Sequence, residues 1–176
     1  AYDNLVNYLE LGGAGSEIWD MMQGLVDVDD KLLERFGIDI RHIRPNPPRE
    51  DEVKRGKDWL VNEFGLMLKK QYQGYYYEFV EDKAPLFNAK GIRDVEAYKG
   101  PSAHEGRFKD LGKRAKVSLD KGFAVTADVL LGGIMEFAVW LRGFTKFYYE
   151  LAANPELAEA VLDKTLEINK RFWQPY

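Results

Sequence analysis

The chain contains no cysteine among its 176 residues, so it can form neither a disulfide nor a thiolate site within its own length. This absence is typical of a protein from a reducing compartment, and we expect the chain to act in the cytoplasm. No apolar run approaches the roughly 20 residues that cross a bilayer. The first eleven residues include acidic side chains, whereas the start of a secretory signal carries basic ones. We therefore expect neither secretion nor a membrane span.

An excess of charge of either sign is also lacking. The chain has 25 Lys and Arg against 29 Asp and Glu, a net charge of -4, and its basic residues are interleaved with acids. Nucleic acids and anionic membranes attract concentrated positive charge, so neither is an expected partner. By contrast, 45% of the residues are hydrophobic and 14% are aromatic, which is enough for a packed core. We expect a single domain over residues 1–176 that is incomplete at both ends.

Periodicity predicts helices over residues 3–11, 16–25, 27–36, 103–119 and 134–153 and from Pro155 onward, with Gly143 as the point where the fifth divides. Alternation predicts a strand over residues 38–43, and a short apolar run over 123–129 predicts a strand buried in a parallel sheet. Residues 66–68 and 75–80 flank Gln73 and Gly74 and predict an antiparallel hairpin. Helix, glycine and strand in succession indicate an α/β fold.

Several segments resemble the uroporphyrinogen decarboxylase superfamily: DDKLLERFGIDIR at 29–41, NEFG at 62–65, GGIMEFAVWLRGF at 132–144 and ANPEL at 153–157. Their order and spacing agree over more than a hundred residues. The resemblance implies a TIM-type (β/α)8 barrel, which needs about 250 residues. We therefore expect a partial barrel in which the strands at 38–43 and 123–129 are neighbours whose ends share one pocket.

The resemblance also implies an activity. Residues 132–143 are similar to the corrinoid-dependent branch, which moves a methyl group between a corrinoid protein and a thiol or another acceptor. Zinc would belong to the full-length protein, and we expect no metal or cofactor within this segment. The alternatives are a uroporphyrinogen decarboxylase, acting on a small-molecule tetrapyrrole, and a non-catalytic truncated scaffold. Decarboxylases would have Asp near the position of Asn46 and Tyr near Val139 or Trp140, which weakens the first alternative.

Substrate-binding candidates follow the first strand, because barrel loops collect anion-binding groups at strand ends. These are Arg41, Arg44 and Asn46; the alternative for the two arginines is an ion pair at the rim. Catalytic candidates are Asp128, at the end of the second strand, and Glu136, in the first turn of an apolar helix. Their alternatives are a turn cap for Asp128 and a favourable interaction with the helix dipole for Glu136.

Two further expectations concern the strand histidine and association. His42 lies inside the first strand, where a hydrogen-bonded structural histidine is the usual interpretation. The aromatic residues of the hairpin are expected to pack there rather than to bind a macrocycle. A partial barrel exposes apolar strand edges and helix faces, so we expect the isolated chain to self-associate as a homo-oligomer.

Overall fold

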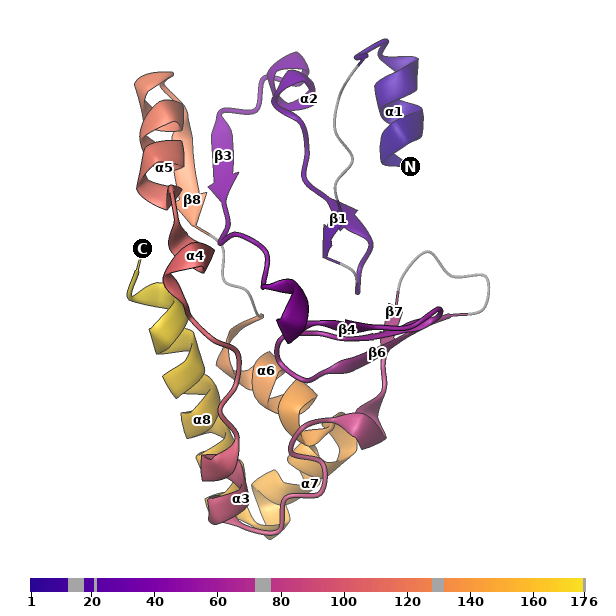
Figure 1. Cartoon of the computed structure of the whole chain (residues 1–176), viewed down its shortest axis with the longest axis vertical. Helices are drawn as coiled ribbons and strands as arrows, with labels where there is room; N and C mark the ends of the chain where they lie inside the picture. The colour runs from indigo at the N-terminus through magenta and orange to yellow at the C-terminus, as the bar shows by residue number, and fades with distance from the viewer. Residues whose placement is uncertain (13–17, 21, 72–76, 128–131, 176) are drawn as a thin grey trace.

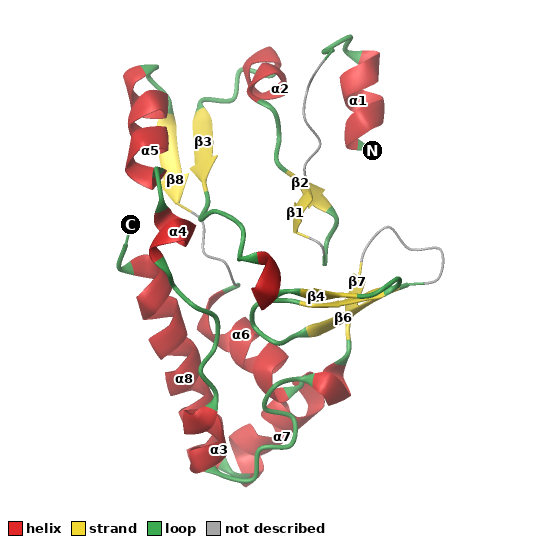
Figure 2. Ribbon diagram, viewed as in Figure 1, coloured by secondary structure: helices red, strands yellow, loops and turns green. Residues whose placement is uncertain are grey.

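The computed structural model describes residues 1–12, 18–20, 22–71, 77–127 and 132–175. These residues form a mixed α/β structure in which the described strands make three separate sheets rather than a closed barrel. Figure 1 shows the parallel strand pair in the upper part, the helical layer in the lower part and a four-stranded sheet between them at one side. Figure 2 shows the same arrangement by element type, with most of the helical residues at the lower end.

The parallel pair consists of β3 (Ile40–Ile43) and β8 (Ala124–Ala127), which lie side by side in register from Ile40 opposite Ala124 to Ile43 opposite Ala127. Both strands were expected from the sequence, and their parallel pairing confirms that they are neighbours. The expected burial of the second strand is wrong, because Ala124 and Ala127 of β8 are exposed and the two residues between them are only partly buried in this two-stranded sheet. Helix α5 (Leu111–Asp120) runs directly before β8 and contacts both strands (Figure 1). Burial alternates along β3, so one face of the pair is covered and the other is open.

An antiparallel sheet has the order β4 (Lys54–Arg55), β5 (Trp59–Val61), β6 (Met67–Lys70) and β7 (Tyr77–Phe79). Leu60, Leu68 and Phe79 are cross-strand neighbours, and both leucines are buried. This register places one apolar face of the sheet against the rest of the molecule. The expected hairpin is confirmed as β6 and β7, while its turn at Gln73 and Gly74 lies outside the described residues.

The helical layer is built from α3 (Ile92–Ala97), α6 (Gly133–Arg142), α7 (Phe144–Ala153) and α8 (Pro155–Trp173), and α8 contacts the other three. The expected division at Gly143 is confirmed. Its φ of +91° suits glycine, and a Cβ there would lie 2.9 Å from the Phe87 ring. At the start of α8 the Asn154 side chain accepts from the Leu157 amide, and Pro155 occupies the first turn.

Among the described residues, the main hydrophobic cluster lies in the lower part of the molecule and is formed by residues between 64 and 172. Its fully or nearly fully buried members are Phe64, Leu66, Leu86, Val95, Phe137, Ala138, Val139, Leu141, Phe147, Leu157, Ala158, Val161, Ile168 and Phe172. Val6, Leu32, Ile43 and Leu60 are buried outside this cluster. The rings of Phe64 and Phe137 meet edge to face with their centroids 5.2 Å apart. The antiparallel sheet and the helices therefore share one core, whereas the parallel pair lies outside it.

The remaining elements include one wrong prediction. Helices α1 (Tyr2–Tyr8) and α2 (Asp30–Arg35) confirm two expected helices, and Asp29 caps α2 through the Lys31 amide. The helix expected over 16–25 is wrong, because Ile18–Asp20 and Leu25–Val26 form the antiparallel strands β1 and β2. The Asp20 carboxylate accepts from the amides of Met22 and Gln23 at 2.8 and 3.1 Å, which stabilises a turn instead of a helix.

The helix expected over 103–119 is divided in two. Short helix α4 (Glu105–Phe108) ends before Asp110, whose φ of +63° is left-handed, and α5 begins at Leu111. A left-handed residue interrupts the helical hydrogen-bond ladder. Two short 3-10 segments, Glu50–Glu52 and Glu81–Lys83, complete the described elements.

Candidate functional site

The carboxyl ends of β3 and β8 form the candidate site, because ligands of parallel α/β proteins bind where the strands end. Arg44 and Asn46 follow β3 directly. On the other strand, the catalytic candidate Asp128 follows Ala127 and lies outside the described residues. The structure therefore brings the two strand ends together, and the candidates on the β3 side can be examined in detail.

Arg41 is buried, with 5% of its surface exposed, on the covered face of the parallel pair. Its Nε lies 2.7 Å from Asp30 Oδ1, and its Nη1 donates to the carbonyl oxygens of Ile38 and Ile40. The guanidinium also lies 3.7 Å from the centre of the Phe123 ring. These contacts hold the start of α2 against the sheet, so Arg41 has the ion pair expected as its alternative role, with Asp30 as the acid.

Arg44 projects toward the hairpin of β1 and β2. It forms an ion pair with Asp27, and its guanidinium lies 4.1 Å from the centre of the Trp19 ring. About a fifth of the Arg44 side chain is exposed, against 58% for Asp27. The arrangement leaves a partly accessible cation at the strand end, whose charge Asp27 offsets.

Asn46 joins the loop after β3 to α4 and to the connection that follows it. Its Nδ2 donates to the carbonyl oxygens of Gly106 and Lys109, and its backbone amide donates to that of Arg107. Arg114 donates to Asn46 Oδ1 and, at 2.8 Å, to the carbonyl oxygen of Arg44. The amide of Asn46 is thus used to fix loop geometry at the site.

Glu136 lies in the first turn of α6 and is exposed. Its carboxylate folds back over Gly132, where an added Cβ would lie only 1.4 Å from Glu136 Oε2. A carboxylate at the first turn of a helix interacts favourably with the unpaired amides and the dipole. Because Glu136 is exposed, its charge needs no buried partner.

The sequence predicts a hydrogen-bonded His42, and the structure confirms this and gives a partner on the neighbouring strand that the sequence did not indicate. His42 is exposed, and its Nδ1 lies 2.5 Å from the hydroxyl oxygen of Thr126, the residue in register on β8. The hydrogen bond of Nδ1 fixes the orientation of the ring and thereby the direction of Nε2. A histidine that transfers protons is oriented in this way. The alternation of Arg41, His42 and Ile43 could have indicated that His42 faces away from the buried side.

Below the site, a group of polar side chains links the loops to the helical core. Arg107 is fully buried, with its Nη1 3.4 Å from Glu63 Oε1 and its guanidinium 5.5 Å from the centre of the Phe172 ring. Nearby, the Tyr98 hydroxyl donates to the carbonyl oxygen of Phe64 at 2.7 Å. Burial raises the pKa of Tyr98 above its ordinary value, so this hydroxyl stays protonated at neutral pH.

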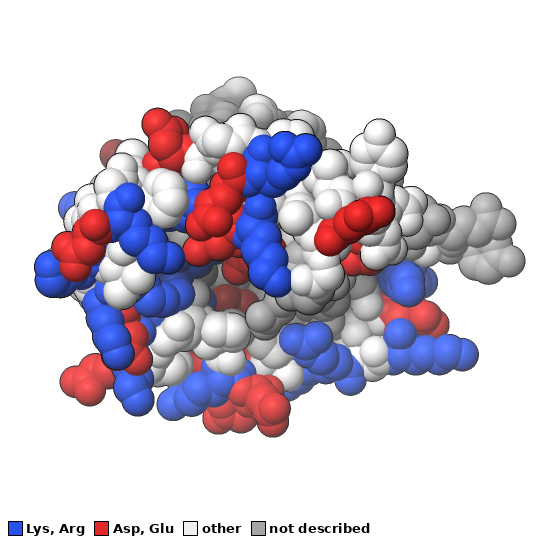
Figure 3. Space-filling model, turned by 90° about the horizontal axis from the view of Figure 1, so that it is seen from above, with Lys and Arg blue, Asp and Glu red and all other residues white. Residues whose placement is uncertain are grey.

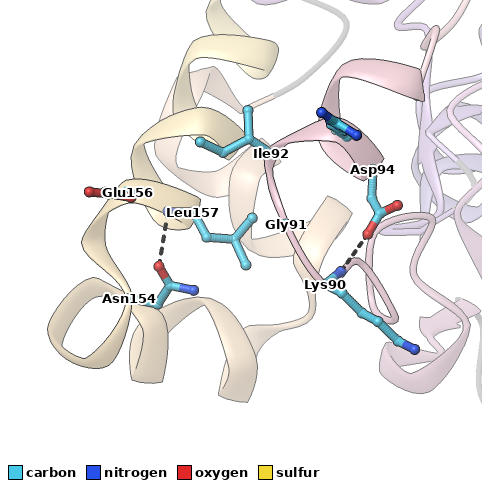
Figure 4. A pocket seen from close by; sticks show the side chains of 8 residues that line it. Lys90, Gly91, Ile92, Asp94, Asn154, Glu156 and Leu157 are labelled. Atoms are coloured by element: carbon cyan, nitrogen blue, oxygen red, sulfur yellow. Dashed lines mark hydrogen bonds between the residues drawn. The ribbon is translucent and has the colours of Figure 1, made fainter.

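A shallow pocket lies at the opposite end of the molecule, between the start of α3 and the start of α8 (Figure 4). Its polar groups serve local structure: the Lys90 amide donates to Asp94 Oδ2 at 2.6 Å, and Asn154 caps α8. None of the candidate residues lines it. We therefore do not assign the function to this pocket.

The distribution of charged side chains and of potential metal ligands further describes the site. Figure 3, a view from above, shows basic and acidic side chains intermixed on this face. Among the residues that the structure describes, no three potential ligands gather where they could hold a metal ion.

In the described part of the chain, no helix combines the length and apolarity needed to cross a bilayer.

Comparison with family models, with curated proteins and with solved structures finds no match to this chain. The mixed α/β class is accordingly defined by the described elements themselves. The family resemblance seen in the sequence stays a prediction.

Proposed function

We propose that the chain is part of a uroporphyrinogen decarboxylase-type barrel whose activity is methyl transfer between a corrinoid protein and a small acceptor such as a thiol. The observation that carries this proposal is the parallel pairing of β3 with β8. The resemblance predicts that these two strands, more than 80 residues apart, are neighbours in one barrel. A pairing of this kind requires a crossover, which here ends with α5 against the sheet.

The two faces of the pair support the same proposal. In a (β/α)8 barrel the helices cover the outer face of the strands, and the inner face lines the interior. Here α5 contacts the pair, while the side chains of Ile40 and His42 are exposed on the other face. In the proposed barrel this open face would be the interior, with Arg44 at its mouth.

Within this proposal the residues have distinct tasks. Arg44 contacts an anionic group of the substrate, and Asn46 fixes the loop that presents it. Asp128 or the His42–Thr126 pair accepts the proton that the acceptor loses on methylation, a task that suits a carboxylate or an imidazole. Glu136 orients the substrate from the start of α6. The described residues do not assemble a zinc site, so no step is assigned to that metal.

A non-catalytic scaffold is the second candidate, and one observation favours it. Arg41, Arg44 and Asn46 each have protein partners, as expected of residues that only hold loops together. The decarboxylase alternative gains no such support, because the Asn46 side chain bonds to backbone carbonyl groups instead of facing the open side.

The experiment is a methyl-transfer assay with the full-length barrel protein to which this chain would belong, methylcobalamin, a simple thiol and added zinc, followed by the change in cobalamin absorbance. We expect turnover proportional to the concentration of that protein, whereas residues 1–176 alone are expected to be inactive. Glu136→Gln should lower the turnover about tenfold or more, because one positioning contact in the transition state is lost. The matched control is Glu156→Gln, since Glu156 is also exposed in the first turn of a helix.

Each outcome discriminates between the candidates. Absence of protein-dependent methyl transfer would overturn the methyltransferase proposal, and release of carbon dioxide from uroporphyrinogen would establish the decarboxylase instead. Equal activity of the Glu136→Gln and Glu156→Gln variants would remove Glu136 from the site. Inactivity with both substrates, together with unchanged folding, is the result expected of a scaffold.

A further inference from the structure

Helix α7 has its charged residues inside and three of its four aromatic residues outside, with only Phe147 packed in the core, which is unlike an ordinary surface helix. Its two charged side chains are Lys146 and Glu150. Glu150, 8% exposed, accepts from Arg142 Nε at 2.8 Å and also pairs with Arg142 Nη2. Lys146 donates to the carbonyl oxygen of Phe87 at 2.6 Å and lies 3.8 Å from the centre of the Phe87 ring. Neither charge is therefore directed away from the molecule.

The outward side of α7 is uncharged and largely apolar. Seven residues of α7 are exposed, and we define the α7 outer face as six of them, without the terminal Ala153: Phe144, Thr145, Tyr148, Tyr149, Leu151 and Ala152. At about 100° per residue they cover about 160° of the helix circumference. Four of them are large and well exposed: Phe144 by 58%, Tyr148 by 47%, Tyr149 by 72% and Leu151 by 41%.

Two of these residues already form a preorganised ridge. The rings of Phe144 and Tyr148 are one helical turn apart, and their centroids lie 4.7 Å from each other. Leu151 continues the same line at the next turn. Exposed aromatic side chains in a fixed arrangement are the usual centre of a protein interface, because they bury large areas at low entropic cost.

We propose that the α7 outer face binds the same face of a second copy of this chain, forming a twofold-symmetric dimer. The lack of charged side chains on this face favours a second copy of the chain as its partner. A charged partner would find no opposite charge there and would leave its own groups desolvated, whereas a second copy brings a matching uncharged surface without repulsion. A twofold axis pairs each residue of the face with a residue of the identical face, and this is the commonest symmetry of soluble oligomers.

The size of the face sets the strength of the dimer. A helix of ten residues is only about 15 Å long, so two such faces bury less than the roughly 800 Å² per partner of a standard interface. The dimer is accordingly weak and depends on concentration. The hydroxyl groups of Thr145, Tyr148 and Tyr149 remain able to bond across the interface or to water, so the contact tolerates partial hydration.

Sedimentation velocity over a concentration series, from the micromolar to the near-millimolar range, tests this proposal. We expect a reversible monomer–dimer equilibrium for the chain. Phe144→Lys should weaken it about tenfold or more, because it places a charge within the apolar contact and removes one of its aromatic rings. Phe36→Lys is the matched control: Phe36 is exposed by 57%, against 58% for Phe144, but lies at the end of α2. Circular dichroism checks that both variants keep their fold.

The absence of cysteine allows a second, positional test. Tyr149→Cys introduces a single thiol on the α7 outer face, and mild oxidation should link two copies. Lys116→Cys, on the exposed surface of α5, should remain largely monomeric. A chain that stays monomeric at all concentrations would overturn the proposal. So would a dimer that Phe144→Lys leaves intact, or one that Phe36→Lys dissociates, since association would then involve the side of the parallel strands.

Discussion

Replacing Glu150 with glutamine removes one charge from the buried pair with Arg142 while keeping the size of the side chain. Arg142 is 4% exposed and Glu150 is 8% exposed, and two nitrogens of the guanidinium face the two carboxylate oxygens. The third, Nη1, donates to the carbonyl oxygens of Leu86 and Phe87. The substitution therefore leaves a cation in the protein interior without a counter-charge.

Breaking a buried pair from one side costs about 3 to 5 kcal/mol, because the remaining charge is desolvated and uncompensated. With a urea dependence of about 2 kcal/mol per molar, this cost shifts the midpoint of urea unfolding down by about 1.5 to 2.5 M. The matched control is Asp120→Asn, which breaks the exposed pair of Lys116 and Asp120. That pair should contribute less than about 0.5 kcal/mol to the free energy of unfolding.

The double substitution Arg142→Met with Glu150→Leu separates charge from packing. Removing both charges should recover much of the loss, and the residual cost of about 1 to 3 kcal/mol comes from the carbonyl groups that lose their donor. Fluorescence-monitored urea unfolding of the four proteins measures these differences. A midpoint shift for Glu150→Gln no larger than that of Asp120→Asn would refute the reasoning, as would a double variant less stable than the single one.

Two further predictions concern a buried hydroxyl and a glycine. Because burial raises the pKa of Tyr98 above its ordinary value of about 10, the unfolded chain loses this proton first and stability falls as the pH rises above about 10. Tyr98→Phe should lower the free energy of unfolding by about 1 kcal/mol at neutral pH, and it should lose less stability than the wild type when the pH rises above about 10. Urea unfolding at neutral pH and above about pH 10 measures both effects. An equal loss at high pH in the two proteins would contradict the role of Tyr98. Gly143→Ala should destabilise the protein by more than about 1 kcal/mol, because φ is +91° and the Cβ meets neighbours at about 3 Å. Gly112→Ala, in a helix with open space around it, should stabilise by about 0.5 to 1 kcal/mol, and thermal unfolding that ranks the two variants the other way would disprove the account.

Much of the fold could be predicted from local signals. The alternation around His42 identified β3, since a strand buried on one side must alternate. The short apolar run before Asp128 identified β8 as a strand, although its residues are less buried than the run predicted. Gly143 and the Asn154–Pro155 pair located the ends of the lower helices, because their preferences depend only on backbone geometry. These features depend on neighbours within a few residues, which a sequence displays directly.

Other features depend on competition that periodicity does not reveal. The residues around Asp20 have helical spacing, yet its carboxylate bonds to two following amides and a hairpin forms. Asp110 adopts a left-handed conformation that divides a continuous helical pattern. Glu136 lies in an apolar helix but is exposed, because the first turn projects beyond the core. In each case the conformation or exposure of one residue differs from what the hydrophobic pattern of its segment predicts.

The candidate site was predicted in position but not in detail. Arg41, Arg44 and Asn46 do lie along and after β3, as the strand pattern requires. Their partners, Asp30, Asp27 and the carbonyl groups of α4 and the connection that follows it, come from other segments and could not be identified from spacing. The pairing of His42 with Thr126 depends on the register of β3 and β8, which only the structure provides.

The position of the main hydrophobic cluster between residues 64 and 172 has a consequence for how the molecule opens. The described residues of the parallel pair, α1 and α2 do not belong to that cluster and include only a few buried apolar side chains, Val6, Leu32 and Ile43. Amide protons of α1, α2 and β3 should therefore exchange with solvent through sub-global fluctuations, whereas those of α6 and α8 should exchange only when the whole cluster unfolds. The candidate site thus lies where a part of the molecule that is expected to open locally meets the part that is expected to open only on global unfolding.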